Sequence, residues 1–514
     1  MGEVRDTKLC TADEAVALIG DEMTVVSGGF VGAGHAEALT AALGRRFTAT
    51  GHPRGLTLVY GAGQGDRATR GTNHLAHEGL LKRVIGGHWA LAPGLGELAV
   101  AGCIEAYNFP QGVLCELFRD IAAGRPGCIT HIGLNTFIDP ALDGGRLNDR
   151  TPPGLVERVE LDGKTWLWYK AFPVHVGLIR ATAADPLGNL VMDEEVLFGE
   201  ALAIAQAAHN CGGIVLAQVR ELRPERAHPH TVRVPGILVD RIVVAEPHEH
   251  EQTFGERFNP GYCASCPPGG SEGAHPIPMP MDCRRIIAAR ACDEIPHGAI
   301  VNLGIGMPEG IARIAAERGW LDRFTLTIES GPIGGVPAGG LSFGASLYPH
   351  AVVDQPAQFD FYDGGGLDFA ALGAAEIDAH GNVNVSKFGP KFAGVGGFVN
   401  ISQTAKRLVF CGTLTTGGLE ATVEDGRLRI VTEGRKRKFV RNVEQISFSA
   451  DRARETGQDV LYITERAVFR LASHGIELIE IAPGIDVQAD VIGQMEFQPI
   501  VREVRPMGRH LFLP

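Results

Sequence analysis

The sequence consists of two halves that follow the same order of short motifs. Residues 25–30 read as an apolar strand that runs into a glycine-rich turn and a helix, and residues 299–306 read the same way. Both helices begin with the pattern Gly-x-(Ala/Pro)-Glu-x-(Leu/Ile), at 34–39 and at 306–311. Because a repeated strand–turn–helix order indicates a duplicated structure, the two halves are predicted to share one α/β architecture.

The correspondence continues along the chain. Each helix is followed by an apolar strand, then by an Asp-x-x-Gly-Asn turn and a further apolar strand. These landmarks lie at 56–60, 185–189 and 213–217 in the first half, and at 324–328, 378–382 and 407–411 in the second. The expected fold class is α/β, with two related domains built on mainly parallel sheets and an active site between them.

Composition predicts where the domains end. Residues 248–281 are rich in proline, glycine, serine and charge and show no helical or strand periodicity. We therefore expect an N-terminal domain at 1–247, a linker at 248–281 and a C-terminal domain at 282–514. A chain of 514 residues is also too long for one ordinary core.

Charge and hydropathy exclude several classes of function. The chain carries 47 basic and 60 acidic side chains, a net charge of −13, so a broad basic surface for nucleic acid or an anionic membrane is not expected. No apolar run reaches the ~18 residues of a membrane span, and the polar N-terminal residues lack a signal-peptide core. These features predict a cytoplasmic protein.

Metal and dinucleotide sites have little support. Only Cys263 and Cys266 form a C-x-x-C pair, and one such pair cannot close a tetrahedral zinc site. The histidines at 228–230 and 248–250 lie in polar connecting segments and are expected at the surface. Residues 61–65 follow a strand but lack the spacing of a dinucleotide fingerprint. No metal and no permanently bound cofactor are predicted.

Glu329 is the position at which the two halves differ chemically. It stands where the first half has Gly61, at the end of an apolar strand, and Ser-Gly-Pro-Ile-Gly-Gly follows at 330–335. A carboxyl at a strand end is partly desolvated, and the glycines leave room for a substrate and for backbone N–H donors. The pattern is consistent with a nucleophilic carboxylate, or with a structural one that caps a turn or pairs with an arginine.

The motifs around Glu329 resemble those of family I CoA-transferases. Ile-Glu-Ser-Gly at 328–331 is similar to the family's Ser-Glu-Asn-Gly signature, with Ile in place of Ser and Ser in place of Asn. Residues 329–335 resemble the propionate and acetate CoA-transferase branch, which fuses both halves in one chain. Gly-Gly-Phe at 28–30, with Gly34, resembles the signature of the first half, although Ala36 replaces its proline. Further stretches that resemble this branch lie at 107–112, 302–308, 381–389, 396–398 and 462–469.

The resemblance implies roles for individual residues. It implies that Glu329 forms a glutamyl-CoA thioester and that backbone N–H groups stabilise the oxyanion. The residues it assigns are Gly396 and Gly397 for the oxyanion, Gly28, Gly29, Phe30 and Gln111 for the substrate, and Asn302, Gly304 and Gly306 for the CoA chain. A polar turn residue remains the alternative for Gln111, and a structural turn remains the alternative for the last three. The basic run at 435–438 either contacts a CoA phosphate or is a solvated surface.

The resemblance also implies substrates and partners. It implies transfer of CoA from a short-chain acyl-CoA to another carboxylic acid, with coenzyme A as substrate and covalent intermediate, in a homodimer or homotetramer without nucleic-acid or membrane partners. Two alternatives stay open: an acyl-CoA hydrolase that uses the same glutamate, and a non-catalytic CoA- or metabolite-binding protein. The identity of the acids depends on residues that converge only in the folded chain.

Overall fold

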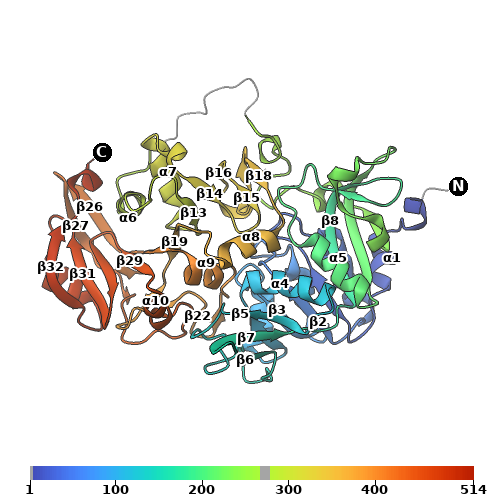
Figure 1. The fold of residues 1–514 in the computed structure, drawn as a ribbon, viewed down its shortest axis with the longest axis horizontal. Helices are drawn as coiled ribbons and strands as arrows, with labels where there is room; N and C mark the ends of the chain where they lie inside the picture. Colours follow the sequence, from blue (N-terminus) through green and yellow to red (C-terminus); the bar gives the residue numbers. More distant parts are fainter. Residues whose placement is uncertain (1–3, 267–277, 514) are drawn as a thin grey trace. The chain divides into compact units, whose positions relative to one another are not determined.

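The computed structural model describes residues 4–266 and 278–513, and the chain forms two compact units (Figure 1). The first unit combines Met1–Gly270 with Ile328–Asp360 and Pro390–Asn400, and the second combines Ser271–Thr327, Phe361–Gly389 and Ile401–Pro514. The domain boundaries inferred from composition stay a prediction, and residues 267–277 of the predicted linker lie outside the described residues.

A mainly parallel sheet forms the framework of the first unit. Its strand order is β11-β9-β8-β1-β2-β3-β4, with β10 next to β8 and β12 next to β10. Parallel pairs join β1 to β2 and β8, β2 to β3, β3 to β4, and β10 to β8 and β12. The strands span β1 Thr24–Ser27, β2 Leu56–Tyr60, β3 Leu81–Gly86, β4 Glu105–Asn108, β8 Val176–Ala184, β9 Leu190–Val191, β10 Ile214–Leu222, β11 Val232–Val234 and β12 Arg241–Val244.

The burial of these strands explains why they pair in parallel. Every residue of β1, β2 and β8 is buried, as expected for strands that are covered on both faces. Parallel neighbours need crossover connections, and helices supply several of them. The helices of this unit are α1 Ala12–Ala17, α2 Glu37–Thr50, α3 Pro93–Val100, α4 Gln111–Ala122 and α5 Ala201–Asn210.

Smaller strands complete the first unit. An antiparallel sheet joins β5 Gly127–Thr130, β7 Lys164–Lys170 and β6 Val156–Leu161. After Glu329 the chain forms two antiparallel pairs: β15 Pro332–Ile333 with β18 Ala351–Val352, and β16 Val336–Pro337 with β17 Ser346–Leu347. The helix α8 Gln355–Asp363 follows β18.

The second unit repeats the same framework. Its parallel strands lie in the order β14-β13-β19-β24-β29, and the C-terminal strands β30, β31 and β32 (orange to red in Figure 1) extend the sheet beyond β29. The bounds are β13 Ile300–Leu303, β14 Thr325–Thr327, β19 Phe369–Gly373, β24 Arg407–Cys411, β29 Asp459–Ile463, β30 Ala467–Ala472, β31 Gly475–Ile481 and β32 Ile500–Pro506.

Helices and short strands surround this sheet. The helices are α6 Cys283–Cys292, α7 Glu309–Glu317, α9 Phe398–Thr404 and α10 Ala450–Thr456. The short strands are β20 Glu376–Ile377, β21 Val383–Asn384, β22 Lys387–Phe388, β25 Thr415–Thr416, β26 Glu420–Glu424, β27 Arg427–Thr432 and β28 Lys436–Arg437, while β23 Lys391–Phe392 belongs to the first unit. Apolar side chains of α6 and α7, with Phe369 and Val409, form a core on the sheet.

The predicted internal repeat is confirmed by topology. The order β2-β1-β8-β10-β12 in one unit equals β14-β13-β19-β24-β29 in the other, with parallel pairing throughout. The two Asp-x-x-Gly-Asn turns also have the same hydrogen bonds. The Asp185 Oδ1 accepts the Asn189 N–H at 2.9 Å, and the Asp378 Oδ1 accepts the Asn382 N–H at 2.9 Å. Both domains are therefore versions of one α/β fold.

Among the described residues, no helix combines the length and the apolar character that crossing a membrane would require.

Candidate functional site

Four predicted or neighbouring site segments follow parallel strands of the first unit. Gly28 comes after β1, Gly61 after β2, Gly87 after β3 and Gln111 shortly after β4. Because the carboxyl ends of parallel strands meet at one edge of a sheet, these segments lie at the same edge. This edge is where α/β sheets of this kind place their ligands.

The turn at 28–30 is fixed by backbone hydrogen bonds. The Gly28 N–H donates to the Leu178 carbonyl at 3.1 Å, and the Phe30 N–H donates to the Ala33 carbonyl at 2.8 Å. Gly29 has φ +130°, and a Cβ added there would lie 2.8 Å from the His35 nitrogen. Only glycine fits this position, so the turn holds its peptide groups in one orientation.

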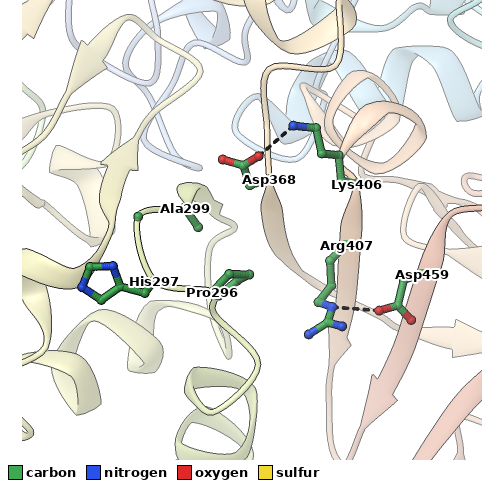
Figure 2. A pocket seen from close by; sticks show the side chains of 8 residues that line it. Pro296, His297, Ala299, Asp368, Lys406, Arg407 and Asp459 are labelled. Carbon is green, nitrogen blue, oxygen red and sulfur yellow. Dashed lines mark hydrogen bonds and ion pairs between the residues drawn. The ribbon is translucent and has the colours of Figure 1, made fainter.

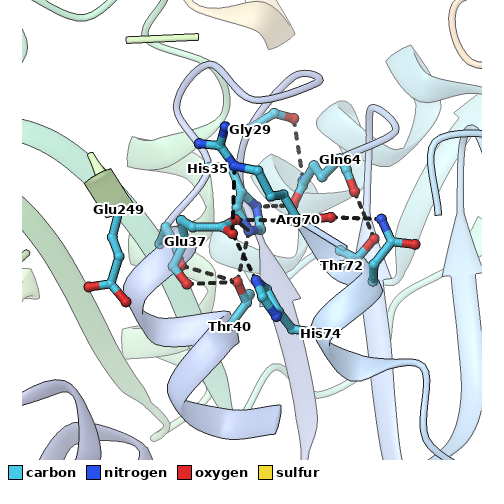
Figure 3. Close-up of polar contacts among 12 residues, drawn as sticks. Gly29, His35, Glu37, Thr40, Gln64, Arg70, Thr72, His74 and Glu249 are labelled. Atoms are coloured by element: carbon cyan, nitrogen blue, oxygen red, sulfur yellow. Dashed lines mark hydrogen bonds and ion pairs between the residues drawn. The ribbon is translucent and has the colours of Figure 1, made fainter. Parts of the chain in front are cut away.

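A buried polar network supports this turn (Figure 3). The Gln64 amide donates to the Ser27 carbonyl at 2.8 Å and to the Gly29 carbonyl at 3.3 Å, while its Oε1 accepts the Ser27 hydroxyl at 2.7 Å. The His35 Nδ1 lies 2.8 Å from the Gln64 Oε1, and its Nε2 lies 2.9 Å from the Thr40 hydroxyl. Burial lowers the pKa of His35 to about 4, so its ring is neutral at pH 7.

A second ring of contacts holds the loop that carries Gln64. The Glu37 carboxylate accepts the Gly71 N–H at 2.9 Å and pairs with the His74 Nε2 at 2.7 Å. The Arg70 guanidinium pairs with Glu251 at 2.9 Å. The Glu37 carboxylate also lies 3.6 Å from the His35 Nε2, so the network of Figure 3 includes a charged group next to the neutral imidazole.

Gln111 and Gly396, which the resemblance assigns to one site, are brought together by the fold. The Gln111 N–H donates to the Gly396 carbonyl at 2.9 Å, and the Gly396 N–H donates to the Gly87 carbonyl at 2.7 Å. The Gln111 side chain is buried, and its Nε2 has no hydrogen-bond partner among the described residues, as is also true of the His88 Nδ1. Buried amides without a partner are rare in folded proteins, so this amide is a candidate for ligand binding.

Glu329 lies just after β14, and its side chain is only 8% exposed. The next residue, Ser330, donates its hydroxyl hydrogen bond to the Gly344 carbonyl at 2.7 Å. A Cβ on Gly344 would lie 2.5 Å from the Phe30 ring, so Phe30 packs directly on the loop that anchors Ser330. The turn at 28–30 and the segment that begins at Glu329 are therefore neighbours within one compact unit.

Gly397 is buried and directly precedes α9. Its neighbour Gly396 has φ +52°. A Cβ on Gly396 would lie 3.6 Å from the Gln111 Oε1 and 3.7 Å from the His88 Cβ. Gly396 thus faces the side chains of Gln111 and His88.

Asn302, Gly304 and Gly306 belong to the second compact unit. The Asn302 side chain is buried and donates to the Thr327 carbonyl and to the Tyr362 hydroxyl, each at 3.4 Å. The Gly304 N–H donates to the Ala371 carbonyl at 2.8 Å, while Gly306 has φ +85° and open space around it. Asn302 lies within β13, and Gly304 and Gly306 belong to the turn that follows it, which corresponds to the turn at 28–30 in the first unit.

A surface depression of the second unit lies at the other edge of its sheet (Figure 2). It has a volume of about 520 Å³ and is lined by residues that precede or begin strands: Pro296, His297, Gly298, Ala299, Asp368, Lys406, Arg407 and Asp459. Lys406 pairs with Asp368 at 2.8 Å and Arg407 pairs with Asp459 at 2.8 Å. Because its charges are paired and it lies away from the turn after β13, it is not the predicted site.

One expectation about histidines is wrong. His228, His230 and His248 are exposed, as predicted, but His250 is buried. Its Nε2 lies 3.1 Å from the Glu195 carboxylate, which also pairs with Arg180 at 3.1 Å. The segment carrying His250 folds onto the sheet because this ion-pair cluster gives the imidazole a polar partner. No cluster of three or more potential metal ligands occurs in the part of the chain that the structure describes.

Sequence reasoning missed Glu200, His88, Gln355 and Gln358. Each has a buried side-chain atom without a hydrogen-bond partner among the described residues. None lies in a motif that stands out by spacing. The Gly-Glu pair at 199–200, directly before a helix, was the one local signal that an acidic residue is placed at a turn.

Comparisons with known proteins identify a family model and several similar chains. The family model described as "Coenzyme A transferase" matches residues 10–245. The chain is 45% identical over 510 residues to an acetate CoA-transferase, YdiF, of Escherichia coli K12, which covers 98% of this chain and 94% of that protein. It is 41% identical over 513 residues to a caffeate CoA-transferase of Acetobacterium woodii, an alignment that covers 98% of this chain and 97% of that protein. The crystal structure of the acyl-CoA transferase YdiF apoenzyme from Escherichia coli O157:H7 superposes with a TM-score of 0.93 at 43% identity, covering 99% of this chain and 96% of that one.

Proposed function

The chain belongs to the coenzyme A transferase family, and from this membership we propose that it moves CoA from a short-chain acyl-CoA to a second carboxylic acid through a glutamyl-CoA thioester on Glu329. The observation that carries the proposal is the place of Glu329. It is a buried carboxyl at the end of β14, in a segment that packs through Gly344 against Phe30.

The proposed mechanism has two symmetrical half-reactions. The Glu329 carboxylate attacks the thioester carbonyl of the acyl-CoA, the C–S bond breaks, and CoA leaves as a thiolate from a mixed anhydride. The thiolate then attacks the side-chain carbonyl of Glu329, which leaves a glutamyl-CoA thioester and releases the first acid as its carboxylate. An incoming carboxylate reverses these steps and departs as a new acyl-CoA.

Each attack places negative charge on a carbonyl oxygen, which fixed N–H donors stabilise. The Gly396 N–H already donates to Gly87, so we propose the Gly397 N–H as the donor. The buried Gln111 amide, whose Nε2 lacks a partner among the described residues, is proposed to orient the substrate carboxylate. Gly28, Gly29 and Phe30 are proposed to line the substrate pocket, and Asn302, Gly304 and Gly306 the path of the CoA chain.

The substrate class is proposed from the chemistry and from the relatives. One relative is named for acetate and another for caffeate, which shows that acids of different size occur among similar chains. We propose short-chain acids such as acetate, propionate and butyrate for this chain. Coenzyme A is proposed to act as substrate and covalent intermediate without a permanently bound cofactor, in a cytoplasmic homodimer or homotetramer.

Acceptor dependence separates transfer from hydrolysis and from simple binding. Purified protein is incubated with acetyl-CoA with and without propionate, and acyl-CoA species are followed by liquid chromatography. Transfer predicts that acetyl-CoA is lost and propionyl-CoA appears only when propionate is present. Equal loss of acetyl-CoA without propionate supports a hydrolase, and binding without turnover supports a non-catalytic protein; either result overturns the proposal.

Substitution of Glu329 tests the nucleophile. Glu329→Gln is expected to lower the exchange rate by roughly 10³-fold or more because the amide is not a nucleophile. Glu329→Asp withdraws the carboxylate by one methylene and is expected to lose at least about 10²-fold. The control Glu225→Gln changes an exposed carboxyl of the same unit and should exchange CoA at the wild-type rate. Wild-type exchange in Glu329→Gln would contradict the mechanism.

A further inference from the structure

Glu200 is a buried carboxyl that the proposed mechanism does not use. It directly precedes α5, and its side chain is 1% exposed. Neither carboxyl oxygen has a hydrogen-bond partner among the described residues. An ionised carboxylate in such surroundings is costly, so its position requires an explanation.

Glu200 lies at the carboxyl edge of the sheet described above. A Cβ on Gly61 would lie 3.2 Å from the Glu200 Oε1 and 3.7 Å from the Gln355 Nε2, so both side chains lie close to the same point above Gly61. The Gln355 N–H donates to the carbonyl of Gly199 at 2.9 Å, which fixes the two residues side by side. The Gly29 N–H also lies close enough to the Glu200 carboxyl to lower its pKa in part.

The unsatisfied atoms of Glu200 and Gln355 are complementary only when Glu200 is protonated. The Gln355 Nε2 donates to the Cys115 sulfur at 3.1 Å, while its Oε1 lacks a donor among the described residues. A neutral carboxyl has one O–H donor for such an oxygen, whereas a carboxylate has none. Burial raises the pKa of Glu200 to about 8, in agreement with this assignment.

Gln355 connects this pair to the segment of the proposed nucleophile. It follows β18, and the Val353 N–H donates to the Gly331 carbonyl at 3.1 Å, two residues after Glu329. On the other side, Glu200 meets the turn that contains Gly29. The pair therefore stands between the two segments that the proposed reaction requires.

We propose that Glu200 is a positioning residue that works as a neutral carboxylic acid. Its O–H donates to the Gln355 Oε1, and its carbonyl oxygen faces the Gly29 N–H. These two contacts hold the 28–30 turn against the segment of Glu329. Ionisation of Glu200 removes the donor and puts a negative charge beside the path of an anionic acid, so CoA exchange declines as the pH rises. This inference rests on the proposed transferase function.

Other titratable groups face Glu200 or lie beside its neighbours. They are Cys115 and Glu116 on α4, Asp354 before α8, His35 behind Gly29, and Tyr60 at the end of β2. The pKa of Glu116 is also raised to about 8 by burial and by Asp360, and burial raises that of Asp354. His35 stays neutral, and burial raises the pKa of Tyr60 far above its usual value. Cys115 and Glu116 thus require their own controls.

The test compares pH profiles of kcat/KM for the acid acceptor between pH 6.5 and 9.5. In the wild type this constant should fall as the pH passes about 8, by about tenfold for each further unit. Glu200→Gln keeps a neutral donor and acceptor, so its profile should stay flat with wild-type activity at pH 7. Glu200→Leu removes both groups and should be about tenfold less active at every pH. Cys115→Ala and Glu116→Gln should retain the wild-type decline.

Several outcomes overturn the proposal. One is a fall of kcat/KM in Glu200→Gln at the same pH as in the wild type. Another is an equal loss of kcat/KM in Glu200→Gln and Glu200→Leu. A third is the loss of the wild-type pH dependence in Cys115→Ala or Glu116→Gln. Infrared difference spectra between the wild type and Glu200→Gln at pH 7 test the protonation state of Glu200 without an activity assay. They should show one protonated-carboxyl band in the wild type, and its absence refutes the assignment of Glu200 even if the chain exchanged no CoA.

Discussion

Gln111 is held by its backbone while its side-chain Nε2 is left without a partner among the described residues. Its N–H donates to Gly396 at 2.9 Å and it starts α4, so the position of its amide does not depend on a ligand. If this amide orients the substrate carboxylate, Gln111→Ala should raise KM for the acid by about 10-fold or more, because a hydrogen bond to a charged group is lost, and change kcat less. Steady-state kinetics with varied acid check this.

The control for Gln111 is Gln206→Ala, which truncates an exposed glutamine on α5 and should leave KM unchanged. An unaltered KM in Gln111→Ala, together with a lower melting temperature, would show instead that Gln111 is a structural turn residue.

Single residues can be predicted from the sequence when their neighbours along the chain already indicate their role. Glu329 ends an apolar strand and is followed by glycines from Gly331 on, so the sequence itself marks it as a candidate, whereas Gln111 is a candidate only through the family resemblance; both assignments stay predictions. Glu200 could not be predicted, because the groups that define it come from residues 29, 61 and 355, which only the folded sheet brings together. His250 was misjudged for the same reason, since Glu195 and Arg180 are distant in sequence.

The strands that belong to the internal sequence repeat could be predicted from the sequence. Strands β1, β2, β8 and β10 and their counterparts β13, β14, β19 and β24 follow the landmarks of the sequence. Among the described residues, the antiparallel sheet of β5, β6 and β7 and the extension by β30, β31 and β32 have no counterpart in the other half, so the internal repeat does not predict them. Their pairing depends on contacts that the repeat does not encode.

The carboxyl ends of β2 and β3 approach so closely that glycine is required between them. A Cβ on Gly87 would overlap the Gly61 carbonyl oxygen and approach the Gln111 Cα at 3.5 Å. Gly87→Ala should therefore push these strand ends apart, with a loss of stability of about 1–3 kcal/mol and a larger fractional loss of CoA exchange. Urea unfolding and the acceptor-dependent assay measure the two effects.

Gly96 in α3 is the matched control for Gly87. No atom lies within 4 Å of a Cβ added there, so Gly96→Ala should stabilise the protein by about 0.5–1 kcal/mol through helix propensity. If Gly87→Ala behaved like Gly96→Ala, the close approach of the two strand ends would be disproved.

For the whole molecule, buried neutral histidines make stability depend on pH. Burial lowers the pKa of His35, His88 and His250 to about 4, below the ~6.5 of an unfolded chain. The unfolded chain therefore takes up protons first, so stability is complete above pH 6.5 and is lost as the pH falls from 6.5 toward 4. Burial acts to raise the pKa of Glu195, but Arg180 and His250 lower it to about 2. The ionised Glu195 therefore stabilises the folded chain at neutral pH, and this stabilisation is lost as the pH falls below about 4.5.

The free energy of unfolding should accordingly fall between pH 7.5 and 5.0, by about 1–2 kcal/mol for each of the three histidines. His88→Gln removes one titrating group, so its stability should be lower at pH 7.5 but decline less steeply. Urea titrations at the two pH values measure this. Parallel declines in wild type and His88→Gln would show that His88 does not contribute.

The glutamyl-CoA thioester on Glu329 is the claim that a single measurement tests most directly. The protein is incubated with acetyl-CoA without an acceptor, treated with borohydride, digested and examined by mass spectrometry. The account predicts that the peptide containing Glu329 carries the mass change of a reduced thioester, and that Glu329→Gln shows neither this change nor exchange. Exchange of CoA without any modification of Glu329, or a modification on a different residue, would contradict it.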